Sequence, residues 1–114
     1  MNVRFSNQGL RCRTSRSELD RLLAGRAVEL ELALPRDHVF RFSVRPTTLS
    51  NWSLETDPTG VWLTIPRAEL EALAESLPRK EGLQQTFDAS NGASVAVAFE
   101  VDLKKEAVSG ARSG

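Results

Sequence analysis

Apolar and polar residues alternate with a period of two along most of this 114-residue chain, a pattern typical of β-strands that are covered on one face. The alternation is clearest in residues 28–34, 40–45, 61–65 and 95–102. Such strands indicate an antiparallel sheet, because a doubly wound parallel sheet shows continuous apolar runs instead. We therefore predict an α+β fold in which an antiparallel meander sheet carries two helices packed on one face.

Two segments break the alternation and predict these helices. The first begins with a capping box, in which Ser15 caps the helix and Glu18 follows three residues later. The second begins at Pro66, a residue suited to the first turn because it lacks an N–H. Each segment carries a leucine stripe that would cover the sheet. No internal repeat is visible in the sequence.

Turn lengths predict the strand register. A hairpin through residues 35–37 pairs Leu32 with Phe40, which places Glu31 opposite Arg41. A turn at residues 46–48 would set Trp52 beside Phe42 in the core, where a tryptophan contributes a large packing area. Trp62 is out of phase with its apolar neighbours, so we expect it on the polar face, across from Glu55.

The polar face of this sheet is the candidate binding surface. Cross-strand ion pairs explain its charges in one interpretation, and recognition of a partner or ligand explains them in the other. Trp62 supports the second interpretation, because tryptophan is enriched at interface hot spots. The residues predicted to form the surface are Trp62, Arg41, Arg45, Glu29, Glu31 and Glu55.

Composition and charge narrow the function classes. Fifteen basic residues balance fifteen acidic residues, so we expect neither nucleic acid nor a membrane as partner. The start of the chain has no signal-peptide pattern, and we expect a cytoplasmic protein. The predicted organisation is a single α+β domain over residues 1–103, followed by a flexible tail over residues 104–114.

The chain offers little that resembles a catalytic or metal site. One cysteine and one histidine exclude a disulfide framework and the usual zinc sites. We interpret Cys12 as a core residue and His38 as a turn residue, and a Cys12–His38 nucleophile pair stays an open alternative. Glu100 and Asp102 share one strand face, where solvation explains them. We predict no catalytic residues, no metal and no cofactor.

The order of motifs resembles an uncharacterised bacterial family of single-domain proteins of about 120 residues. The resemblance rests on the helix start Ser15–Glu18, the strand start Ala27–Glu29 and the strand-to-helix junction Leu63–Pro66. The last strand, residues 99–105, keeps the acidic residues of that family but lacks its lysine and cysteine. The resemblance implies an α+β fold and no particular activity.

These observations favour a non-enzymatic protein-interaction module, although enzymatic activity stays open. The alternative is a protein that binds a small anionic ligand on the charged face of the sheet. Residues 94–102 form a long, well-patterned strand. If this strand lies at a sheet edge, it would pair with a second copy, so we expect a homodimer.

Overall fold

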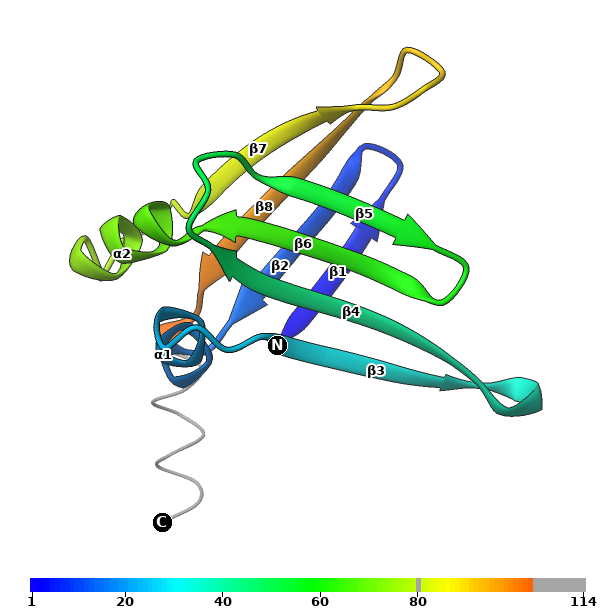
Figure 1. The fold of residues 1–114 in the computed structure, drawn as a ribbon, viewed down its shortest axis with the longest axis horizontal. Helices are drawn as coiled ribbons and strands as arrows, with labels where there is room; N and C mark the ends of the chain where they lie inside the picture. The colour runs from blue at the N-terminus through cyan, green and yellow to red at the C-terminus, as the bar shows by residue number, and fades with distance from the viewer. Residues whose placement is uncertain (80, 104–114) are drawn as a thin grey trace.

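The computed structural model describes residues 1–79 and 81–103, which form two four-stranded sheets and two α-helices (Figure 1). The α+β class is therefore confirmed, while the predicted tail over residues 104–114 lies outside the described residues. Sheet A has the strand order β1–β2–β8–β7, and sheet B has the order β3–β4–β6–β5. The strands are β1 (Asn2–Ser6), β2 (Gly9–Thr14), β3 (Val28–Leu34), β4 (His38–Thr47), β5 (Ser53–Asp57), β6 (Gly60–Pro66), β7 (Leu83–Asp88) and β8 (Ser94–Val101).

The prediction of one antiparallel meander is wrong. Strands β2 and β8 pair in parallel in sheet A, and β4 and β6 do so in sheet B. Trp52 consequently does not lie across from Phe42, since β6 separates β5 from β4. The inward side chains of β6 are all buried, so this strand takes an interior position. Alternation reveals which face of a strand is covered, but not which strand lies beside it.

The helices close one end of the molecule instead of covering one sheet face (Figure 1). Helix α1 (Arg16–Leu23) leads from sheet A to sheet B, and α2 (Arg67–Glu75) leads from sheet B back to sheet A. Each helix must therefore bridge the two layers. The capping box is confirmed: Ser15 Oγ accepts from the Glu18 N–H, and Glu18 Oε1 accepts from the Ser15 N–H.

One hydrophobic core joins both sheets and both helices. Its buried side chains come from the inward faces of all the interior strands and from the leucine stripes of the helices. Trp52 belongs to this core, as predicted, although it lies just before β5 rather than beside Phe42. The fully buried members with the largest side chains are Phe99, Leu19, Leu22, Leu63, Ile65, Leu70 and Leu73.

The chain contains an internal structural repeat that the sequence did not reveal. The elements β1, β2, α1, β3 and β4 form a hairpin, a helix and a second hairpin, and the elements β5, β6, α2, β7 and β8 do so in the same order. Each sheet takes the first hairpin of one half and the second hairpin of the other half. The two halves therefore have the same topology, and exchanging one half with the other exchanges sheet A with sheet B.

Two glycines occupy equivalent positions in this repeat and allow the parallel strand pairs to approach. A Cβ on Gly9 would lie 1.8 Å from the Ala96 carbonyl oxygen, and one on Gly60 would lie 2.2 Å from the Arg41 carbonyl oxygen. The backbone bonds beside them also match, with Ala96 N–H donating to Gln8 O and Arg41 N–H donating to Thr59 O, both at 2.9 Å. Neither position tolerates a side chain without movement of the neighbouring strand.

Strand β8 lies between β2 and β7, which corrects the expectation that it forms a sheet edge. Its backbone groups are engaged on both sides, so it cannot add a second copy of the chain. The argument for a homodimer through residues 94–102 therefore fails. The outermost strands are β1 and β7 in sheet A and β3 and β5 in sheet B.

Candidate functional site

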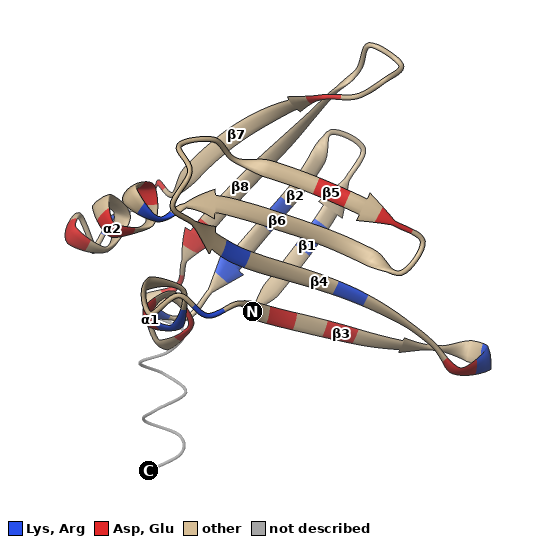
Figure 2. Ribbon diagram, viewed as in Figure 1, with Lys and Arg blue, Asp and Glu red and all other residues tan. Residues whose placement is uncertain are grey.

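The structure places all six predicted surface residues on the outer face of sheet B. One row of side chains crosses the four strands in the order Glu29, Ser43, Trp62, Glu55. The next row contains Glu31 and Arg41, and Arg45 lies one row toward the other end of β4. Figure 2 shows acidic residues on β3 and β5 and basic residues on β4.

Arg41 is held between two glutamates of β3. Its guanidinium donates to Glu31 Oε1, and its Nε lies 3.9 Å from Glu29 Oε2. The hydrogen bond and the charge of Glu31 raise the pKa of Arg41 above its usual value. Because all three side chains are exposed, these contacts chiefly set the geometry of the surface and contribute little to stability.

The net charge of this face is acidic. Glu29, Glu31, Glu55 and the neighbouring Asp57 outnumber Arg41 and Arg45 on the outward positions of the four strands. An acidic surface attracts a basic partner more strongly than an anion. The arrangement therefore favours the protein-partner hypothesis over the anionic-ligand hypothesis for these six residues.

Trp62 and Ser43 form the centre of the face. Trp62 is half-buried and lies across from Glu55, as the register predicted. Ser43, in the neighbouring strand position, is fully buried, and its hydroxyl has no hydrogen-bond partner among the residues that the structure describes. Sequence reasoning missed Ser43, because a serine at an outward strand position is normally solvated.

A second exposed surface lies on the inward side of the β3–β4 hairpin. The strands of the two sheets cross at an angle, so this hairpin extends beyond sheet A (Figure 1). Leu30, Leu32 and Leu34 consequently stay 40%, 57% and 41% exposed. The alternation identified their shared face, but their exposure depends on the crossing of the sheets, for which the sequence held no signal.

The residues considered for chemistry lie apart. Cys12 is buried in the core, and burial raises the pKa of its thiol to about 12. His38 is exposed at the start of β4 in the other sheet, which argues against a nucleophile pair with Cys12. Glu100 pairs with Arg11 and Arg13 at 3.6 and 3.2 Å. Within residues 1–79 and 81–103, no three metal-ligating side chains cluster, and no helix has the length and apolarity to cross a membrane.

The chain matches a known family model. A family model described as a family of unknown function, DUF7009, matches residues 1–107. The chain belongs to this family. The DUF7009 match confirms the resemblance to an uncharacterised single-domain family and assigns no activity. No curated protein and no solved structure matches the chain.

Proposed function

We propose that this protein is a non-enzymatic interaction module that adds an extended, basic segment of a partner protein to the edge of β3. The observation that carries the proposal is the exposure of Leu30, Leu32 and Leu34 on an outermost strand. Large exposed apolar side chains in a row are costly in a monomer and mark interaction sites. A peptide that pairs with the strand edge would obtain backbone hydrogen bonds and cover these leucines.

The charge of β3 indicates the chemistry of the partner. Glu29 and Glu31 alternate with the leucines and point to the outer face. A partner strand that alternates apolar and basic residues would therefore match both faces of β3 at once. Two copies of β3 would bring glutamates together, which disfavours pairing between identical chains.

The outer face of sheet B would extend the same interface. Glu55 and Arg45 lie on this face with Trp62, which offers an aromatic anchor to a larger partner. We also propose a cytoplasmic location, supported by the lone cysteine, which is buried as a free thiol. In this proposal residues 1–103 act as one unit with one core.

A pair of synthetic peptides tests the proposal. One alternates lysine with valine and the other alternates glutamate with valine, both six residues long. Isothermal titration with the full chain should show binding of the lysine peptide and none of the glutamate peptide, because only the former complements Glu29 and Glu31. Equal binding of both peptides would contradict the proposed edge.

Two matched variants locate the binding. Leu32→Ser should abolish binding of the lysine peptide. Leu49→Ser should leave it unchanged, since Leu49 is also exposed (71%) but lies between β4 and β5, at the other end of β4 from Leu32. Circular dichroism checks that both variants are folded. Equal affinities in the two variants would refute a role for the leucine face.

A further inference from the structure

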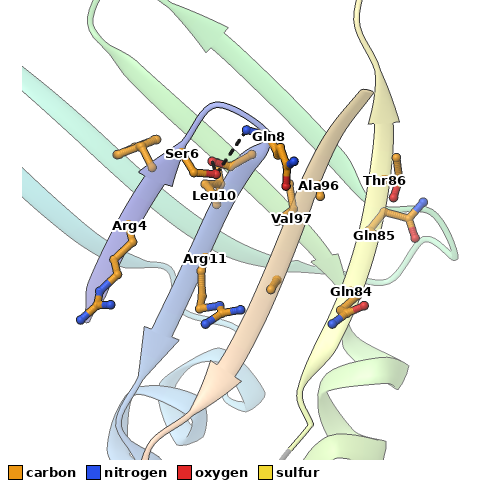
Figure 3. A pocket seen from close by; sticks show the side chains of 13 residues that line it. Arg4, Ser6, Gln8, Leu10, Arg11, Gln84, Gln85, Thr86, Ala96 and Val97 are labelled. Carbon is orange, nitrogen blue, oxygen red and sulfur yellow. Dashed lines mark hydrogen bonds between the residues drawn. The ribbon is translucent and has the colours of Figure 1, made fainter. Parts of the chain in front are cut away.

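The outer face of sheet A contains a groove. The groove has a volume of about 380 Å³, within the usual range of small-molecule sites. Its floor consists of Gly9, Ala96 and Ala98 in the two central strands. Figure 3 shows Arg4 and Arg11 on one side of this floor and Gln84 and Thr86 on the other.

The internal repeat allows the groove residues of sheet A to be compared with the residues at the equivalent positions of sheet B. In sheet B, the positions equivalent to Ala96 and Ala98 carry Arg41 and Ser43, and the position equivalent to Arg11 carries Trp62. The larger side chains fill the central strands there. The groove is thus not a consequence of the backbone alone, because it depends on the small residues in sheet A.

The charges of the groove are arranged for an anion. Arg4 and Arg11 lie directly opposite each other in the β1–β2 pair, an arrangement in which like charges destabilise a sheet. Glu100 lies 3.6 Å from Arg11 Nε and 3.2 Å from an Arg13 terminal nitrogen. No ion pair of Arg4 is present among the described residues. Figure 3 shows the Arg4 and Arg11 side chains turned toward the same end of sheet A, with their two guanidinium groups apart from each other.

We propose that this groove binds a small phosphorylated molecule, with its phosphate between Arg4 and Arg11. A phosphate monoester carries nearly two negative charges and so satisfies two arginines, whereas a carboxylate carries one. The uncharged part of the molecule lies over Gly9, Ala96 and Ala98. There the Gln84 amide and the Thr86 hydroxyl offer hydrogen bonds.

Ribose 5-phosphate is a suitable probe, with inorganic phosphate and ribose as comparison compounds. Each is titrated into the full chain at constant ionic strength, and backbone amide shifts are followed by NMR. Ribose 5-phosphate should shift the amides of Gly9, Arg11 and Ala98 in a saturable way, with an affinity several-fold above that of phosphate. Ribose alone should cause no shift.

Three variants separate the parts of the proposal. Arg4→Gln should weaken binding of ribose 5-phosphate at least tenfold. Arg21→Gln removes the same charge from an exposed position on α1 and should have no effect. Ala98→Leu should fill the groove and remove the advantage of ribose 5-phosphate over phosphate, while phosphate binding itself persists.

The opposite results overturn the proposal. Shifts that reach the amides of Arg21 and Arg26 equally would reveal only general attraction of anions to arginines. Equal affinities of Arg4→Gln and Arg21→Gln for ribose 5-phosphate would show that Arg4 does not bind the phosphate. If the folded wild-type chain binds ribose 5-phosphate no more tightly than phosphate, the groove floor does not contribute to binding.

Discussion

Glu69 contacts Trp52 just as Glu18 contacts Met1. Each glutamate is the third residue of its helix and accepts a hydrogen bond at 2.8 Å from a nitrogen 17 residues earlier in the chain. The donor is the N-terminal ammonium group of Met1 in one half and the indole Nε1 of Trp52 in the other. The repeat therefore preserves the contact while its donor differs.

Trp52→Phe should lower the free energy of unfolding by about 1–2 kcal/mol, since it keeps most of the buried ring but removes the hydrogen bond to the Glu69 carboxylate. Urea denaturation measures the change. Trp62→Phe is the matched control, and its smaller effect is expected because the Trp62 side chain lies on the outer face. Equal losses in both variants would contradict the prediction.

The contribution of Glu18 should depend on pH. Burial tends to raise the pKa of this carboxyl group, but hydrogen bonds from the Met1 ammonium group and the Ser15 N–H, with the ammonium charge, lower it below its usual 4.5. The folded protein then holds this proton less tightly than the unfolded chain, so the stabilisation is present above pH 4.5 and is lost as the pH falls.

Urea denaturation of the wild type and Glu18→Gln at pH 7 and pH 3 tests this dependence. The difference in the free energy of unfolding between the wild type and Glu18→Gln should be smaller at pH 3 than at pH 7. Glu75→Gln, on the exposed end of α2, is the control and should show no such change. A difference that stays constant between the two pH values would show that the carboxylate charge has no role.

Gly9→Ala and Gly60→Ala should each lower the free energy of unfolding by roughly 1–3 kcal/mol or more, because the added Cβ would meet the backbone of the adjacent parallel strand. Thermal denaturation followed by circular dichroism measures both variants. Asn7→Ala, in the exposed turn before Gly9, is the control. A melting temperature unchanged by either glycine substitution would refute the close approach in that half.

Ser43→Ala should raise the free energy of unfolding by about 1 kcal/mol, because it removes a buried hydroxyl that has no partner among the described residues. Chemical denaturation provides the measurement. Ser53→Ala, at a less buried position on the same face, should have little effect. A loss of stability in Ser43→Ala would indicate that the hydroxyl is hydrogen-bonded.

Cys12 should resist thiol reagents in the folded protein, because burial holds the pKa of its thiol near 12 and keeps it protonated. Reaction with a colorimetric disulfide reagent at pH 8 should follow global unfolding in urea. Because the folded protein holds the thiol proton more tightly than the unfolded chain, this group's contribution to the free energy of unfolding is fully present below pH 9. The contribution is lost as the pH rises from 9 to about 12. Rapid labelling without urea would contradict the burial of Cys12.

The fold was predictable as far as local patterns determine it. The capping box at Ser15 depends on residues three positions apart, and the pairing of Leu32 with Phe40 depends on one turn length. Both predictions are confirmed for that reason. The parallel pairing of β4 with β6 joins segments separated by a crossover, and no local pattern identifies such a neighbour.

In the candidate site, too, the features set by local register were predictable, and the features that join distant segments were not. Register alone placed Trp62 across from Glu55 and Glu31 across from Arg41, and the structure confirms both pairs. The groove of sheet A was missed because Arg4 and Ala98 come from opposite ends of the chain. The repeat was missed because its halves share few residue types, among them Gly9 with Gly60 and Leu19 with Leu70.

The exchange of hairpins between the halves has a genetic consequence. Neither half can complete a sheet alone, because each sheet needs one hairpin from each half. A shorter gene that encoded a single half could produce the same architecture only as two associated copies. If those copies were joined into one chain, the sequence of each half could change independently. The two outer faces could then differ, with Trp62 on one and an open groove on the other.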